Sequence, residues 1–104
     1  MESTSVVTAL AALAQDTRLQ IFRSLVRAGP GGLPAGAIAE AVGTPASTLS
    51  FHLKELANAG LANARQEGRF VYYSANYSTM SEVVAYLTAH CCQGAQPRQV
   101  RRRA

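Results

Sequence analysis

Apolar residues recur at helical spacing along most of the chain, and at a period of two in one short stretch. Near residues 4–14 the apolar positions lie three or four apart, which predicts a short helix. One narrow stripe of that helix can be buried, and it consists of Val6, Leu10 and Leu13.

A second helix is expected in "TRLQIFRSLVRAG". Asp16 precedes it as a capping carboxylate, and Gly29 is placed to end it. Its buried face is expected to contain Leu19, Phe22 and Val26. The "GPGG" that follows predicts a loop.

Two helices separated by a tight turn come next. "PAGAIAEAV" is expected to open at Pro34 and to close at Gly43, and the next helix to begin with Thr44 as cap and Pro45 in its first turn. The inward stripe of that helix is predicted to be Leu49, Leu53 and Leu56. Such a pair is a helix-turn-helix candidate, although many helical pairs share the pattern.

The period changes to two in "LANARQEGRFVYYSANY", which predicts a hairpin around a Glu67–Gly68 turn. A hairpin directly after a candidate recognition helix is typical of a wing. Arg65 and Arg69 flank its tip, where they would meet phosphates or a minor groove. The alternative is two solvated arginines on a surface hairpin.

A last helix is expected to start at Thr79, with Glu82 completing a capping box, and to end near Gly94. Cys91 falls on the continuation of its apolar stripe. That stripe consists of Met80, Val83, Val84 and Leu87.

Composition fits one small domain, expected at residues 1–95. The apolar fraction is 48% of 104 residues, and no apolar run approaches the roughly 18 residues of a membrane helix. The start of the chain makes a poor signal peptide, so a cytoplasmic protein is expected. The net charge of +4 lies entirely in the tail, because residues 1–97 hold six bases and six acids. That tail, residues 96–104, is expected to be disordered; it could attract phosphates or have no role.

"STLSFHLKEL", followed by "AGL" and "RQEGRFVYY", carries a resemblance to a known family. Over about residues 5–92 the chain resembles the ArsR/SmtB family of metal-responsive repressors. The resemblance implies a winged helix-turn-helix fold, mainly α with a small β-hairpin, whose recognition helix enters the major groove of operator DNA. It also implies a homodimer through the first and last helices, with an interface of Val6, Leu10, Leu13, Val83, Val84 and Leu87.

The recognition helix carries chemistry suited to that role. Short hydroxyls can reach base edges or phosphates, a lysine can pair with a phosphate, and an aromatic ring can touch a thymine methyl group. For the histidine, the alternative is a half-buried side chain that braces the helix, and for the hydroxyls a plain helix surface. The candidate residues are Ser47, Thr48, Ser50, Phe51, His52 and Lys54.

Cys91 and Cys92 are the only cysteines, and two thiolates suit soft, thiophilic ions. Sensing sites that the family places elsewhere are absent: "PAGAIAEAV" has no cysteine, and Glu82 and His90 have the wrong spacing for the zinc type. Some arsenic-responsive relatives carry a cysteine pair here with a third cysteine beyond it, which this chain lacks. By ligand count the pair therefore matches methylarsenite, while arsenite would need a further ligand; antimonite and mercury are alternatives.

Neighbouring residues in a helix point about 100° apart. The pair is expected in the last helical turn, so binding must unwind or distort that turn near Gly94, and the helix dipole raises the thiol pKa. Such a distortion would move the recognition helices off their spacing and release the DNA.

Other interpretations of the function stay open. They are a redox sensor with bridges between subunits, inert cysteines in a regulator of another signal, and a dimerisation module without a DNA role. A cysteine enzyme is disfavoured, since His90 and Cys91 would diverge on a helix, and no catalytic cofactor is expected.

Overall fold

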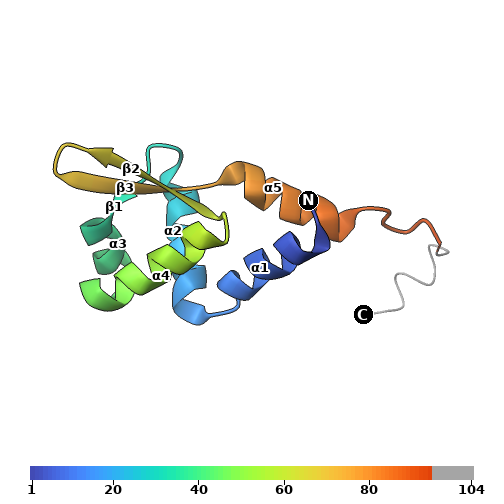
Figure 1. The fold of residues 1–104 in the computed structure, drawn as a ribbon, viewed down its shortest axis with the longest axis horizontal. Coiled ribbons are helices and arrows are strands. Elements are labelled where there is room, and N and C mark those ends of the chain that lie inside the picture. Colours follow the sequence, from blue (N-terminus) through green and yellow to red (C-terminus); the bar gives the residue numbers. More distant parts are fainter. Residues whose placement is uncertain (95–104) are drawn as a thin grey trace.

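The computed structural model describes residues 1–94, so the predicted tail at 96–104 and the end of the predicted domain at 95 lie outside the described residues. Its elements follow one another along the chain as a helical body with one projecting hairpin (Figure 1). They are α1 (Ser3–Leu13), α2 (Asp16–Ala28), β1 (Leu33–Pro34), α3 (Ala35–Val42), α4 (Ala46–Asn58), β2 (Ala62–Glu67), β3 (Phe70–Ala75) and α5 (Tyr77–Thr88). This confirms the predicted winged helix-turn-helix fold.

The core forms where α2, α3 and α4 meet. Each fully buried Leu or Ile side chain stabilises the fold by roughly 1.5–3 kcal/mol relative to exposure. The predicted stripe of α4 is confirmed, because its three leucines are buried. The largest fully buried side chains are Ile21, Leu25, Ile38, Leu49, Leu56 and Leu61. In residues 1–94 the longest helices are too short and too polar to span a bilayer.

The turn between α3 and α4 depends on Gly43, which adopts a left-handed conformation with φ of 66° and ends α3 as predicted. The Thr44 N–H donates to the carbonyl of Ala39. The capping position of α4 is Pro45 rather than Thr44, so the helix begins one residue later than expected.

The start of α2 also differs from expectation. The capping residue is Gln15, whose side-chain oxygen accepts the N–H of Arg18 at 2.8 Å, and Asp16 is the first helical residue. The buried face is rotated as well: Leu19 is 42% exposed, whereas Ile21 is buried. The prediction is confirmed for Phe22, which is buried, and for Val26, which packs against the core, and it is wrong for Leu19. Leu19 and Ile21 are two apart and cannot share a helix face, and tertiary packing selects Ile21.

The wing contains a third strand that the sequence did not predict. Leu33 and Pro34 form β1, which pairs with Tyr73 and Tyr72 of β3, so the sheet order is β1-β3-β2. Two residues are too few to show an alternating pattern. The hairpin itself is confirmed, but Glu67 pairs with Phe70, and its turn is therefore Gly68–Arg69.

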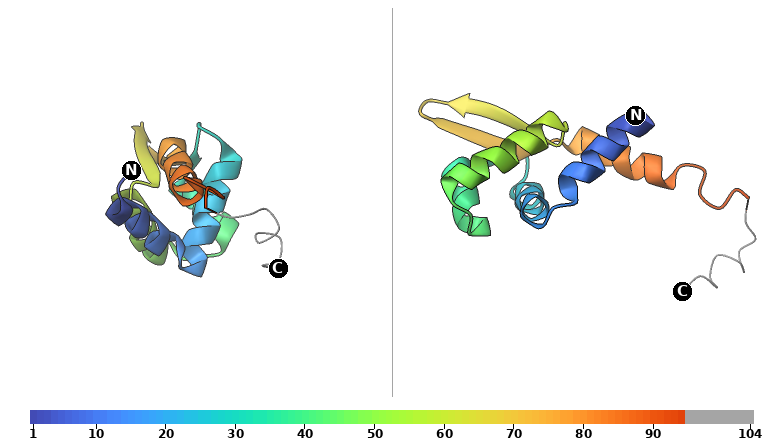
Figure 2. Two further views of the ribbon diagram at one scale, coloured as in Figure 1. Left: turned by 90° about the vertical axis from the view of Figure 1, so that its right-hand side faces the viewer. Right: turned by 60° about the horizontal axis from the view of Figure 1, so that its bottom comes forward.

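Helix α5 starts earlier and ends earlier than predicted. Asn76 caps it by accepting the N–H of Thr79 at 3.2 Å, so the expected Thr79–Glu82 capping box is wrong. The helix ends at Thr88, well before Gly94. Helices α1 and α5 lie against each other at the end of the molecule opposite the wing (Figures 1 and 2).

Gly32 offers a test of how tightly the α2–α3 loop is held against β3. Its φ is 77°, and an added Cβ would collide with the carbonyl oxygen of Tyr73. We expect Gly32→Ala to destabilise the protein by about 2 kcal/mol or more, because it combines left-handed strain with overpacking. Gly31→Ala is the control, since a Cβ there meets nothing within 4 Å. Urea unfolding that gives equal stabilities for the two variants would contradict this packing.

Candidate functional site

The outer face of α4 is polar because the three leucines of the helix point inward. Ser47, Thr48 and Ser50 are exposed, and so is Lys54. The Ser50 hydroxyl donates to the carbonyl of Ala46 at 3.2 Å, which leaves its lone pairs available. Phe51 is 57% exposed on the same face, an uncommon position for a large aromatic ring.

His52 is not on that outer face. Its side chain is 8% exposed, and its Nδ1 lies 3.3 Å from Nη1 of Arg18 on α2. Its ring also meets that of Phe51 edge-on, with centroids 5.5 Å apart. Of the two interpretations offered by the sequence, this position favours the bracing histidine over the direct DNA contact. Arg18 itself was missed, because its partner lies 34 positions away and no local pattern reveals the pair.

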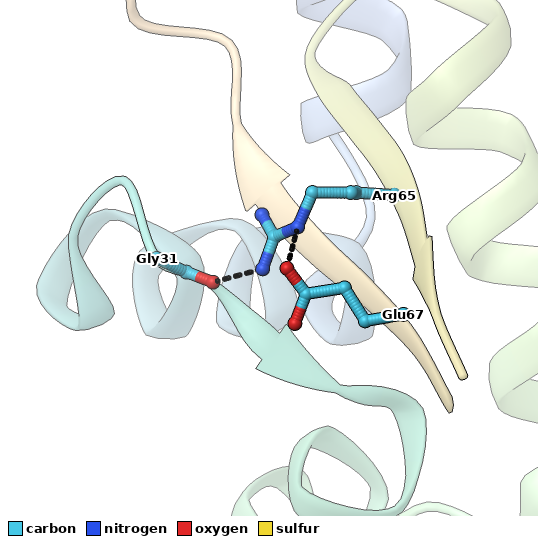
Figure 3. A network of polar contacts seen from close by, with 3 residues as sticks. All are labelled: Gly31, Arg65 and Glu67. Atoms are coloured by element: carbon cyan, nitrogen blue, oxygen red, sulfur yellow. Dashed lines mark hydrogen bonds and ion pairs between the residues drawn. The ribbon is translucent and has the colours of Figure 1, made fainter. Parts of the chain in front are cut away.

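Arg65 is held by the protein on two sides (Figure 3). Its Nε donates to the Glu67 carboxylate at 2.8 Å, and Nη2 donates to the carbonyl of Gly31 at 3.2 Å. The guanidinium also lies 5.2 Å from the ring centroid of Tyr72. These contacts connect the wing to the α2–α3 loop, so Arg65 has a structural task beside any contact with DNA.

The tip of the wing exposes Arg69 in the turn itself and Phe70 directly after it. Phe70 is 59% exposed. Among the described residues the one ion pair is that of Arg65 with Glu67. Arg69 therefore presents its charge at the outermost point of the hairpin.

The expected dimer surface separates into covered and exposed residues. Val6 and Val83 are buried between α1 and α5 of one chain, and Leu13 is half-buried, so the first two help to pack the monomer. Leu10, Val84 and Leu87 are exposed. Two large side chains that were not predicted, Val7 and Tyr86, are exposed on the same two helices.

Cys91 and Cys92 lie beyond α5, not in its last turn. Their Sγ atoms are 3.1 Å apart, and both side chains are exposed. His90 and Cys92 have φ angles of 60° and 67°, so the chain after Thr88 turns sharply and brings the two thiols together. The expectation that ligand binding must unwind the helix is therefore wrong, because the helix has already ended.

The Cys91 thiol influences the ionisation of its neighbour. The pKa of Cys92 is raised, chiefly by its hydrogen bond with Cys91 and then by the charge of that neighbour. The helix dipole was also expected to raise this pKa, but α5 ends at Thr88, three residues before Cys91. Loss of both protons on ligand binding is therefore more costly than for two separate cysteines.

The donor set fits a ligand that needs two sulfurs. Within residues 1–94, no three side chains from His, Cys, Asp and Glu come together to hold a metal ion. A tetrahedral structural zinc site needs four ligands, so this pair alone does not provide one. The residues present fit a metal or metalloid that needs only two thiolates. They also fit one whose remaining ligands are solvent or a small thiol.

Comparison with known proteins gives a family model and several relatives. Residues 13–64 match a family described as a helix-turn-helix domain. The chain is 34% identical over 79 residues to a homologue of the cadmium resistance regulatory protein CadC from Staphylococcus aureus. It is 31% identical over 94 residues to the transcriptional activator HlyU from Vibrio cholerae, covering 90% of this chain and 84% of HlyU. The match to the CadC homologue spans 76% of this chain and only 64% of that protein.

Solved structures agree with the fold. One is the homodimeric winged helix-turn-helix DNA-binding domain of a possible ArsR-family regulator from Mycobacterium bovis. It has a TM-score of 0.67 and 32% identity, covering 85% of this chain and 86% of that one. NolR from Sinorhizobium fredii has a TM-score of 0.67 and 30% identity, covering 90% and 89%.

The contact between the thiols predicts a measurable change in reactivity. Replacing Cys91 by Ala removes the main causes of the raised pKa of Cys92, so the pH dependence of Cys92 alkylation should move to lower pH. Site-resolved mass spectrometry after timed iodoacetamide treatment, with a phosphine reductant, measures this shift. Gln93→Ala is the control. Identical pH profiles for Cys92 in the wild type and in Cys91→Ala would show that the thiols do not interact.

Proposed function

Because the chain belongs to the ArsR/SmtB family of winged helix-turn-helix transcriptional regulators, we propose that it is a repressor released from DNA by a trivalent arsenical. In this proposal a homodimer binds operator DNA and dissociates when arsenite or methylarsenite binds Cys91 and Cys92. The observation that carries the effector assignment is the pair of exposed thiols 3.1 Å apart directly after α5.

The DNA-binding surface in this proposal is the outer face of α4 together with the wing. Hydroxyl groups of Ser47, Thr48 and Ser50 are short donors and acceptors on an exposed helix face, which suits contacts with base edges or phosphates. Lys54 adds a phosphate contact, and the exposed ring of Phe51 can lie on a thymine methyl group.

The two arginines of the wing have different tasks. Arg69 lies in the exposed turn and supplies the phosphate or minor-groove contact. Arg65 donates hydrogen bonds to Glu67 and to the carbonyl of Gly31, and it thereby holds the wing at a fixed angle to the α2–α3 loop. Its contribution to DNA binding is therefore mainly through the orientation of the wing.

Dimerisation through α1 and α5 is supported by the apolar side chains left uncovered there. Leu10, Val84 and Leu87 are 39%, 56% and 60% exposed. Exposed apolar side chains gathered on two adjoining helices are typical of an interface. The Mycobacterium bovis domain is described as homodimeric.

The chemistry of the pair favours an arsenical over harder cations. Thiolates bind soft ions, and Mg²⁺ or Ca²⁺ prefers oxygen ligands. Methylarsenite keeps one bond to carbon and needs two sulfur ligands, the number that this chain provides. Arsenite would complete its set with oxygen, a small thiol or a sulfur from the second subunit. Antimony and mercury share the preference for sulfur, and the relative from Staphylococcus aureus is named for cadmium resistance.

The signal would pass through α5. Ligand binding fixes the segment that follows Thr88, and α5 packs against α1 at the proposed interface. A change in how these helices pair alters the distance between the two recognition helices of the dimer. A coupling of about 1–3 kcal/mol is sufficient, since it lowers DNA affinity about 5- to 150-fold.

Thiol oxidation is a second candidate signal, because both thiols are exposed and can form bridges between subunits. One solved structure of a relative is described as reduced HlyU from Vibrio cholerae. Hydrogen peroxide would oxidise two thiols, one from each subunit, to one disulfide and two waters, and thiol reductants would reverse the change.

The salt dependence of DNA binding separates the two arginines of the wing. Arg69→Ala should reduce the slope of log K against log salt by about 1.8, because the homodimer loses two phosphate contacts, one from each subunit. Arg65→Ala should leave that slope nearly unchanged and lower the stability of the protein by about 0.5–1 kcal/mol. Fluorescence anisotropy over a salt series and urea unfolding measure both. If the salt slope falls in Arg65→Ala and not in Arg69→Ala, the phosphate contact belongs to Arg65 and the structural role to Arg69.

The central prediction concerns release of DNA. A labelled fragment from upstream of the protein's own gene is bound by the reduced wild type, then titrated separately with arsenite, methylarsenite and hydrogen peroxide. We expect methylarsenite to release the DNA, and Cys91→Ser and Cys92→Ser each to abolish release while binding DNA normally. Gln93→Ser, a neighbouring change without a thiol, should respond like the wild type.

Each other outcome has a defined meaning. If the wild type binds no DNA with its own upstream sequence, the repressor assignment is wrong. Binding without release by either arsenical rejects the effector, and release by peroxide alone, reversed by a phosphine, establishes the redox alternative. Release by arsenite at equal concentration indicates a further ligand.

A further inference from the structure

One arginine contacts both other helices that meet at the N-terminal end of α2. Arg18 lies in the first turn of α2 and is half-buried. Its Nε donates to the carbonyl of Ala12 in α1 at 2.7 Å, and its Nη1 lies 3.3 Å from Nδ1 of His52 in α4. A single side chain therefore links α1, α2 and the proposed recognition helix.

The contact with α1 has a clear physical basis. Ala12 is in the last turn of α1, where carbonyl groups have no partner within the helix. The cationic guanidinium also lies at the negative end of the helix dipole, which is favourable. The end of α1 is therefore fixed to Arg18 by a hydrogen bond and by charge.

The contact with α4 determines the state of His52. A guanidinium has only donors, so Nδ1 must be the acceptor and the ring proton must be on Nε2. Because His52 is 8% exposed, this bond fixes the imidazole inside the protein. Phe51, the next residue, meets that ring edge-on and lies on the outer face of α4.

We propose that Arg18 is a positioning residue for DNA binding, which fixes the recognition helix relative to α1 through His52. The inference rests on the proposed function, because it assumes that α4 contacts DNA. It assigns Arg18 no contact with DNA. In this inference His52 accepts a hydrogen bond from Arg18 through Nδ1, and its Nε2 does not contact DNA.

The planar fork of the guanidinium is essential to this role. It presents several N–H groups in a fixed plane and can hold two acceptors at a set angle. A lysine keeps the charge but carries its donors on one rotatable nitrogen. Because the recognition helix is then less well placed on DNA, Arg18→Lys is expected to weaken DNA binding about tenfold or more.

The first experiment compares DNA binding by the wild type, Arg18→Lys, Arg18→Met and Arg23→Lys at several salt concentrations. Arg23 is the matched control, because it lies exposed on the same helix. We expect Arg23→Lys to bind like the wild type. Both Arg18 variants should bind more weakly with an unchanged salt slope. Wild-type affinity in Arg18→Lys overturns the inference. A slope reduced by about 2 in Arg18→Met also overturns it, because that change would indicate one phosphate contact by Arg18 in each subunit.

A second set of variants leaves Arg18 in place and tests the two ring nitrogens. Asn places an acceptor near the position of Nδ1, and Gln reaches the position of Nε2. We expect His52→Asn to bind DNA better than His52→Gln and His52→Leu. The reverse order for Asn and Gln would place the function of His52 on the DNA side. In the double variant Arg18→Lys/His52→Leu, the losses of DNA affinity should not add, because both changes break the same contact.

A spectroscopic measurement tests the contact without DNA. The ¹⁵N signals of the His52 ring at mildly alkaline pH should show the Nε2–H form in the wild type and a mixture of tautomers in Arg18→Lys. His90→Gln identifies the signals, since the chain has two histidines. An unchanged tautomer in Arg18→Lys rejects the contact. If the wild type binds no DNA, the proposed function itself is rejected. If the wild type binds DNA and Arg18→Lys binds it equally well, only this inference is rejected.

Discussion

Burial of the α4 leucine stripe is the constraint on which the rest of the structure depends. Leu49, Leu53 and Leu56 are 2%, 3% and 0% exposed, packed in one core with Ile21 and Leu25 of α2. Once that face is inside, the opposite face of α4 must be outside, with its hydroxyls and Phe51. The leucines thus orient the helix, and the contacts of Arg18 and Arg65 refine the positions of α1 and the wing around it.

The sequence predicted what depends on local pattern. The helices, the hairpin and the inward face of α4 follow from apolar spacing, and the end of α3 follows from one glycine. The starts of α2, α4 and α5 were displaced. Gln15 and Pro45 are weaker caps by composition than the expected Asp16 and Thr44, so composition favours the wrong residue, whereas Asn76 and Thr79 both cap well and composition does not separate them. Strand β1 was missed because its two residues are ordered by pairing with β3, a contact distant in sequence.

The sequence predicted which residues form the candidate site but not how they are arranged. Adjacent cysteines are visible in the sequence, whereas the end of α5 at Thr88 and the positive φ angles of His90 and Cys92 are not. Similarly, "LSFHL" marks a recognition helix, but only the fold shows that His52 faces Arg18. Contacts between residues far apart in sequence leave no periodic signal, and they determine which polar side chains are structural.

The residues that follow α5 have a consequence for how such a protein can diversify. Side chains from Ala89 to Gly94 are all exposed, so none of them contributes to the buried core. Under the proposed function, substitutions there alter the effector site at little cost to folding, while changes in α4 or α2 must preserve the core. On that proposal, effector specificity can drift between lineages faster than the DNA-binding scaffold, and exchange of this short segment is the way to seek new responses from one stable fold.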